Sequence, residues 1–186
     1  MPAAVLAIGL GYALGGRLSH LAALRLRWPA LAMVGLALQL VTGPGDVVPV
    51  LALYLSFALL VAFAVANIRT PGFVLVLVGV LMNLAVIAVN DGMPVSRSAL
   101  VASGQADTIG ELASGETVKH HLSGPGDDLV FLGDVIAVPA LEQVISVGDV
   151  FVYGGFVLVV ALGMRRRAVP VPRSGLALPE GVPDGA

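Results

Sequence analysis

Residues able to do acid–base chemistry gather in one part of the chain, between Lys119 and Asp149. Lys119-His120-His121 is the densest group of candidate donors and bases, and Asp134 and Asp149 follow it. Histidine titrates near neutral pH, so one imidazole beside a carboxylate can act as a general acid or base. His120, Asp134 and Asp149 are therefore the catalytic candidates. The sequence contains no serine nucleophile motif and no phosphate-binding glycine loop to accompany them.

The same part of the chain predicts neither a metal centre nor a bound cofactor. Adjacent histidines point to opposite faces of a strand, or lie about 100° apart on a helix, so they chelate one ion poorly together. Asp127, Asp128 or Asp134 would have to complete such a site, and their spacing matches no metal-binding signature. The chain has no cysteine, which excludes disulfides, thiolate ligands and a cysteine nucleophile.

Asp149 is the only acid inside an apolar segment that is predicted to cross a membrane. An unpaired charge at membrane depth is costly, so such a residue needs a partner and is a candidate functional residue. Lys119, His120 or Asn90 could supply that partner, whereas a hydrated helix end would need none. We expect one polar cluster made of Asn90, Lys119, His120, Asp134 and Asp149.

Asn90 and Asp91 stand where a long apolar run stops. Gly92 permits a left-handed helix cap, and Pro94 forbids continuation of the helix. A helix end therefore explains this motif without any function. Because the motif falls on the same side of the membrane as the other polar motifs, both residues are kept in the candidate binding set, which is Asn90, Asp91, Lys119, His120, Asp134 and Asp149.

The elements that carry these residues are predicted to be membrane helices. The chain is 58% hydrophobic and 12% charged, whereas soluble domains are about a quarter charged. Apolar segments cover residues 2–16, 28–42, 47–66, 71–90 and 144–163. The last three reach the length of about 20 residues that crosses a bilayer, and the first two are shorter, so they cross a thinned bilayer or form a re-entrant hairpin. The fold class is an all-α transmembrane helix bundle of about five spans.

Basic residues predict the direction of these spans. Eight of the ten lie at Arg17 to Arg27, at Arg69 and at Arg165 to Arg173, three regions that share one side if all five segments cross. The positive-inside rule makes that side cytoplasmic, with the N-terminus out and the C-terminus in. The composition suggests a bacterial genome, so the expected location is the bacterial cytoplasmic (inner) membrane.

The expected organisation places a small polar region between the fourth and fifth spans. Four helices occupy residues 1–90, a small irregular extracytoplasmic cap 91–143, the fifth helix 144–163 and a disordered cytoplasmic tail 164–186. Within the cap, Ser96 is placed to begin a helix that ends near Gly104, and residues 116–122 read as extended. The cap carries eight acids and two bases, a balance that disfavours nucleic acid, so none is expected as a partner.

Four short motifs of the chain resemble a known family. They are Asn90-Asp-Gly-Met-Pro-Val95, Lys119-His120, Leu132-Gly-Asp134 and Ser146-Val-Gly-Asp149. Together they resemble an uncharacterised family of bacterial multi-pass membrane proteins, domain of unknown function 5317. Asp91 stands where the family pattern has a small residue. The resemblance extends over about residues 1–163 and implies a multi-pass membrane protein, with no activity, cofactor or substrate attached.

Three functional interpretations fit these observations. The leading one is a non-catalytic envelope protein that contacts the lipid bilayer and whose outer cap binds another envelope protein or lipid. The second is a small membrane enzyme acting on a lipid-linked or phosphorylated substrate at the outer leaflet. The third is a transporter or channel subunit, disfavoured because the chain has few charges in its apolar segments and no internal repeat. Whether the protein is an enzyme is left open by the sequence.

Overall fold

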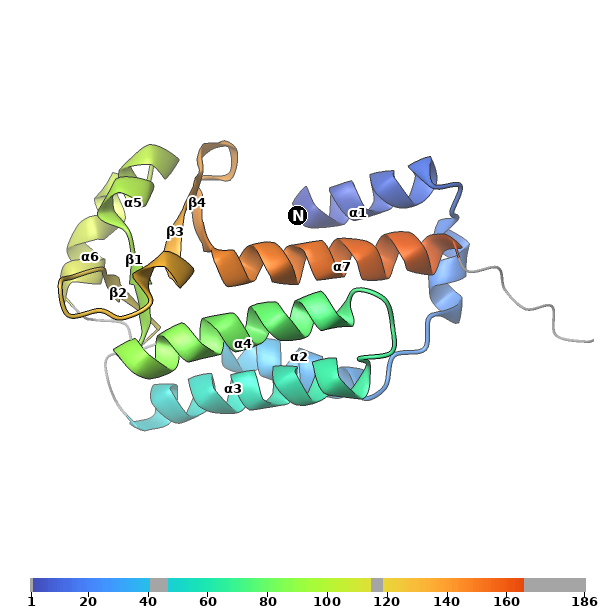
Figure 1. The fold of residues 1–186 in the computed structure, drawn as a ribbon, viewed down its shortest axis with the longest axis horizontal. Coiled ribbons are helices and arrows are strands. Elements are labelled where there is room, and N and C mark those ends of the chain that lie inside the picture. Colours follow the sequence, from blue (N-terminus) through green and yellow to red (C-terminus); the bar gives the residue numbers. More distant parts are fainter. Residues whose placement is uncertain (1, 41–46, 115–118, 166–186) are drawn as a thin grey trace, which may run out of the picture.

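The computed structural model describes residues 2–40, 47–114 and 119–165, which form a helix bundle with a small mixed cap at one end (Figure 1). Among the described helices, three are long and apolar enough to cross a membrane: α3 (Val47–Ala66), α4 (Phe73–Asn90) and α7 (Val147–Arg165). Their outward side chains are largely apolar, with Leu51 62% and Val74 54% exposed. A surface of this kind suits lipid, and together with the length of these helices it indicates a membrane protein.

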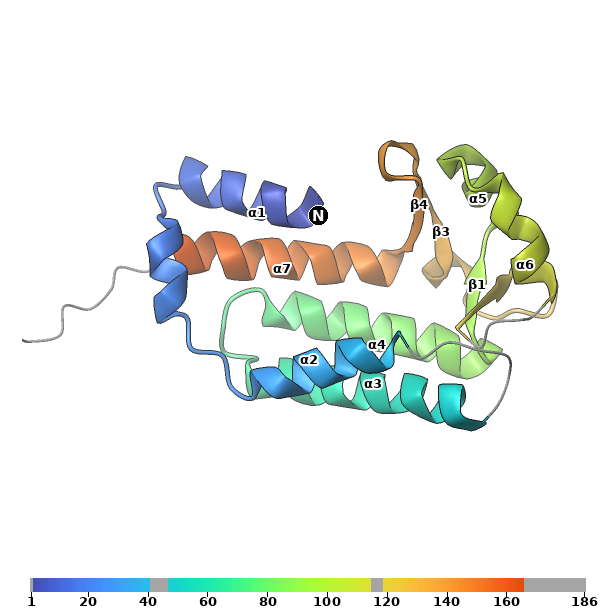
Figure 2. The same cartoon turned by 180° about the vertical axis from the view of Figure 1, so that it is seen from behind.

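Two shorter apolar helices flank this three-helix core: α1 (Pro2–Ala13) and α2 (Pro29–Leu38). They have 12 and 10 residues, so they are about 18 and 15 Å long and shorter than a hydrocarbon core of about 30 Å. Helix α1 lies along α7 and α2 lies against α3 (Figure 2). The described structure therefore has three helices of spanning length rather than five, and membrane crossing by α1 and α2 stays a prediction.

Helices α4 and α7 approach closely because glycines face each other along their contact. A Cβ atom on Gly79 would meet the backbone oxygen of Gly148, and one on Gly72 would meet that of Gly155. The absence of these side chains lets the two backbones touch, as is common in membrane helix pairs. The same contact brings Asn83 of α4 next to the first turn of α7.

The cap between α4 and α7 contains a four-stranded sheet, which corrects the prediction of an irregular region. The strands are β1 (Met93–Val95), β2 (His120–Leu122), β3 (Asp134–Val138) and β4 (Gln143–Ser146), in the order β2-β1-β3-β4. Strand β1 pairs in parallel with β2 and β3, and β3 pairs antiparallel with β4. Strands of three to five residues are too short for the alternating pattern that identifies a strand in a sequence.

Short helices complete the cap. They are α5 (Arg97–Ser103), η2 (Ala106–Thr108), α6 (Ile109–Ser114), η3 (Val130–Leu132) and η4 (Pro139–Leu141). The predicted start and end of the first are confirmed, because Ser96 accepts a hydrogen bond from the Ala99 N–H and Gly104 is left-handed with φ 87°. Met164 and Arg165, predicted to begin the tail of residues 164–186, belong to α7 because the apolar helix continues to Arg165. The rest of that tail and residues 115–118 lie outside the described residues.

The end of α4 differs in one respect from the prediction. The left-handed cap residue is Asp91, with φ 53°, and its N–H bonds the carbonyl of Ile87. Aspartate tolerates this conformation better than most residues because its short side chain bonds locally. Gly92 follows with φ 153° and leads into β1, so the cap sheet begins directly at the helix end. Met93 of β1 packs into the core between α3 and α4, which ties the sheet to the bundle.

Candidate functional site

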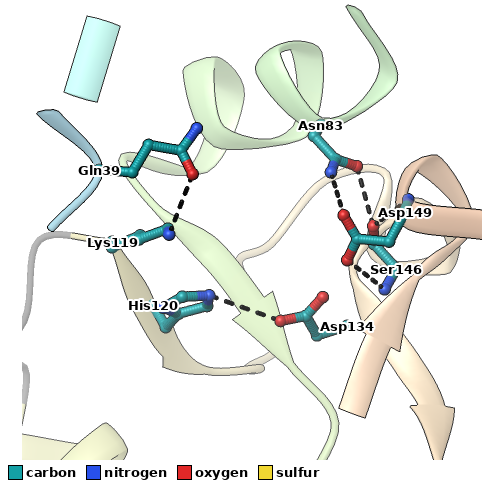
Figure 3. A network of polar contacts seen from close by, with 7 residues as sticks. All are labelled: Gln39, Asn83, Lys119, His120, Asp134, Ser146 and Asp149. Carbon is teal, nitrogen blue, oxygen red and sulfur yellow. Dashed lines mark hydrogen bonds and ion pairs between the residues drawn. The ribbon is translucent and has the colours of Figure 1, made fainter. Parts of the chain in front are cut away.

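Four of the six predicted binding residues meet where the cap joins the bundle (Figure 3). Lys119 precedes β2, His120 begins β2, Asp134 begins β3 and Asp149 lies in the first turn of α7. With Tyr153 of α7, these side chains line the same two cavities. We call Lys119, His120, Asp134, Asp149 and Tyr153 the polar cluster.

The sheet explains why residues distant in sequence come together. Strand β1 follows α4 directly and lies between β2 and β3, with Met93 opposite His120 and Val95 opposite Asp134. On the other edge of β3, Ser146 pairs with Asp134 and leads without a loop into α7. The helices α4 and α7 thus connect directly to two strands of the sheet, β1 and β4.

Asp149 is held by a reciprocal cap at the start of α7. Its N–H donates to the Ser146 hydroxyl oxygen at 2.9 Å, and its carboxylate accepts from the Ser146 N–H at 3.1 Å. This is the geometry of a capping box. The carboxylate also accepts from the Asn83 amide at 2.9 Å, and the Ser146 hydroxyl donates to the Asn83 carbonyl oxygen at 2.9 Å.

This network adds two partners of Asp149 that the sequence did not predict. Asn83 and Ser146 donate hydrogen bonds to its carboxylate, and the charge of Asp149 also acts on His120, whose pKa it raises against the effect of burial. An amide and a backbone N–H thus donate to this carboxylate where the cap joins α7, so Asp149 is anchored with its position fixed. The bonds leave part of its acceptor capacity unused, because a carboxylate offers about four lone-pair positions.

His120 and Asp134 lie on opposite sides of β1, with the imidazole Nε2 atom 3.6 Å from a carboxyl oxygen of Asp134. Burial, and then the charge of Lys119, lower the pKa of His120 to about 4. Burial, and then the charge of Asp149, raise the pKa of Asp134 to about 7. At neutral pH the imidazole is therefore uncharged and Asp134 is divided between its two protonation states, so the contact is no salt bridge.

Lys119 links the cap to α2. Its ammonium donates to the side-chain oxygen of Gln39 at 3.4 Å, just beyond the end of that helix. Among the described residues that line the two cavities, Lys119 is the only lysine or arginine. The amide that accepts this bond is neutral, and the charge of the ammonium also acts on the nearby Asp134 carboxyl group, whose pKa it lowers against the effect of burial.

The polar cluster separates two cavities of different character. The outer cavity, of about 530 Å³, lies within the cap and adds Gln105, Thr108 and Glu111 to the polar cluster. The inner cavity, of about 270 Å³, extends between the membrane helices and is lined mainly by apolar side chains of α2, α3, α4 and α7. The site therefore offers hydrogen-bonding groups on one side and apolar surface on the other.

Asn90 and Asp91 do not join the polar cluster. The Asn90 amide donates to the carbonyls of Val86 and Asp128, and its oxygen accepts from the Asp128 N–H at 2.7 Å. Asn90 thus fastens a cap loop to the end of α4. Asp91 is exposed and borders a separate small cavity beside α3. Both positions suit a structural role at the helix end.

A second histidine–carboxylate contact lies in the same loop. His121 Nε2 is 3.0 Å from Asp127, which also accepts from the Gly124 N–H at 2.8 Å. Partial burial opposes the charge of Asp127, but the Gly124 N–H and the His121 imidazole together lower its pKa. Among the described residues, no group of three or more histidines and carboxylates is placed to hold a metal ion.

Sequence reasoning missed Ser146, Asn83 and Gln39 as parts of the site. Ser146 and Asp149 have the spacing of a capping box, which was a usable signal. Asn83 and Gln39 are polar residues within or beside apolar segments, where an amide needs a partner, but the sequence does not say which partner. Their positions beside Asp149 and Lys119 emerge only from helix packing.

Residues 23–161 match the model of a family of unknown function (DUF5317). The matched range covers most of the chain and contains every member of the polar cluster. Neither curated proteins nor solved structures give a match. No characterised relative therefore assigns a ligand or a reaction to the site, and its role has to be argued from its own chemistry.

Proposed function

The chain belongs to the DUF5317 family, whose function is unknown, and we propose that it is a non-catalytic membrane protein whose cap binds another component of the cell envelope. The observation that carries this proposal is the polar cluster, whose five residues line both the outer polar cavity and the inner apolar one. Ligand sites are typically concave, with apolar walls and a few convergent polar groups. A site that joins both surfaces at the membrane boundary suits a component of the membrane itself.

The distribution of charge supports an outward-facing cap. The segment after α1, the connection between α3 and α4 and the C-terminal end of α7 lie at the end of the bundle remote from the cap (Figure 1), and these segments carry Arg17, Arg69 and Arg165. By the positive-inside rule that end faces the cytoplasm, so the cap faces outward from a bacterial cytoplasmic membrane. The acidic cap and the basic opposite end fit this orientation.

Thermal unfolding of the purified protein in detergent tests the binding proposal. A ligand that binds only the folded state raises the melting temperature, with about 2.7 kcal/mol of stabilisation at one hundred times its dissociation constant. A total bacterial lipid extract and an envelope protein extract are added separately. We expect one of them to raise the melting temperature of the native protein.

Paired variants connect that shift to the site. The variant K119Q/D134N alters the polar cluster, and the control R97Q/D107N makes the same chemical changes at exposed cap positions. The extract that stabilises the native protein should stabilise the control and leave the cluster variant unchanged. An equal response in all three proteins, or no response of the native protein to either extract, contradicts a binding site here.

A catalytic role is a second candidate, favoured by the protonation of one residue. Asp134, with its pKa raised to about 7 by burial, borders a cavity beside an uncharged His120. Groups with pKa values near the working pH make effective general acids and bases. Phosphate release from lipid-linked substrates, lost in the variants D134N and H120Q while binding persists, would favour this enzyme role over simple binding.

A further inference from the structure

The inner cavity has the position and lining of a site for a lipid chain. It runs along α4 from Ile87 to Val80, a distance of about 10 Å at the helical rise. Leu36 of α2, Phe57 of α3 and Val152 of α7 form its other walls. Helices α3, α4 and α7 are apolar and long enough to span a membrane, and α2 is a shorter apolar helix, so an alkyl chain is the occupant that these walls fit.

The mouth of this cavity is closed by the polar cluster and by one residue of α2. Lys119 reaches over the cavity to bond Gln39, while Asp134 and Asp149 lie on the opposite side of the view in Figure 3. A chain in the inner cavity would therefore place its head group among Lys119, Asp134 and Asp149. The outer cavity continues from the same residues into the cap and provides space for that head group.

The charges around the mouth select among head groups. Lys119 is the only lysine or arginine among the described lining residues, whereas Glu111, Asp134 and Asp149 supply three carboxyl groups. His120 is uncharged at neutral pH because burial lowers its pKa. A purely anionic head group would find one favourable charge and several opposing ones. A zwitterionic head group matches both signs, with its anionic part at Lys119 and its cationic part at the carboxyl groups.

We propose, building on the binding function above, that the two cavities together hold a lipid with a phosphoethanolamine-type head group. The first part of one acyl chain occupies the inner cavity, the phosphate lies at the Lys119 ammonium, and the primary ammonium donates to Asp134 and Asp149. The primary ammonium is essential to this assignment because it donates up to three hydrogen bonds. A choline head group carries the same charge but has no N–H to donate.

Native mass spectrometry of the full chain measures this selectivity. The detergent-purified protein is mixed with equal amounts of phosphatidylethanolamine, phosphatidylcholine and phosphatidylglycerol that share the same acyl chains. We expect the ethanolamine lipid to be retained about tenfold over each of the others, which corresponds to about 1.4 kcal/mol. Equal retention of the ethanolamine and choline lipids, or preferred retention of the glycerol lipid, overturns the proposal.

Single variants test which residue binds the phosphate and which binds the ammonium of the head group. K119Q removes the phosphate partner and D134N removes one ammonium partner, and each should lower retention of the ethanolamine lipid about tenfold. The controls R97Q and D107N, at exposed cap positions, should retain it as the native protein does. Each variant is first shown by circular dichroism to keep native helix content, and unchanged retention in folded K119Q and D134N rejects the site.

The outcome also separates this inference from the binding function on which it rests. If an envelope extract stabilises the protein but the ethanolamine lipid does not bind selectively, the head-group assignment alone is wrong. If no extract stabilises the protein and no lipid is retained, the binding function fails as well.

Discussion

Replacing Asp134 by asparagine should reverse the pH dependence of stability between about pH 4 and 6.5, the folded and ordinary pKa values of His120. Asp134 has its pKa raised from 3.8 to about 7. The folded state therefore holds a proton that the unfolded state has released, and Asp134 makes stability fall as the pH rises through this range. His120 acts in the opposite direction, because its lowered pKa leaves the folded state without a proton that the unfolded state binds.

The relative sizes of these two contributions decide whether the stability of the native protein rises or falls with pH. A pKa shift of one unit corresponds to about 1.4 kcal/mol of folding free energy. The shift of the Asp134 pKa from 3.8 to about 7 therefore contributes at most about 4 kcal/mol. The His120 side chain is 35% exposed against 11% for Asp134, and solvent screening reduces its share to about 1.5 kcal/mol. The native protein should lose stability from pH 4 to 7.

In the variant D134N the contribution of Asp134, which makes stability fall as the pH rises, is removed. The contribution of His120, which makes stability rise with pH, remains. Burial, Lys119, Asp149 and His121 act on the pKa of His120, and all of these are unchanged. Stability should therefore rise by about 1.5 kcal/mol as the pH increases from about 4 to 6.5. For a chain of this size, 1 kcal/mol corresponds to about 2–4 °C in melting temperature.

Melting curves recorded by circular dichroism at several pH values in one detergent measure this reversal. The variant D107N is the control, since Asp107 is exposed on the cap and its replacement should leave the native profile unchanged. Other carboxyl groups titrate equally in all three proteins and cancel in the differences. A melting temperature of D134N that falls with pH as in the native protein refutes the assigned protonation states of the pair.

Three further predictions concern the bundle and its orientation. Replacing Asn83 by leucine removes the amide that donates to Asp149 and should cost about 1–3 kcal/mol of unfolding free energy, measured by denaturant titration; N83Q, which keeps an amide, should cost less. Replacing Gly155 by alanine drives a methyl group against α4 and should lower the melting temperature, whereas Gly154, with open space around its Cβ position, should accept alanine with little change. A reporter active only in the cytoplasm should work when fused after Gly175, and one active only outside should work within the cap, while silence of both would reject the proposed orientation.

Local patterns in the sequence were enough to predict the membrane class and several elements. The segment 47–66 coincides with α3, and the predicted start and end of α5 at Ser96 and Gly104 are those of the structure. Hydrophobic runs and cap residues act within a few positions along the chain, so their effect can be read without knowing the fold. The short lengths of α1 and α2 were already suggested by apolar segments below the spanning length.

The cap sheet and the partners of the site residues were decided by the tertiary structure. Strand β1 has three residues, one of them Pro94, and it becomes the parallel neighbour of two strands only because α4 delivers it between them. Asp149 bonds Asn83 across 66 residues because facing glycines let α4 and α7 touch. Asn90, expected at the polar cluster, instead bonds Asp128 across 38 residues. The need of a polar residue in an apolar segment for a hydrogen-bond partner can be predicted from the sequence. Several residues could satisfy the same hydrogen bonds, and the packing of the helices determines which of them does.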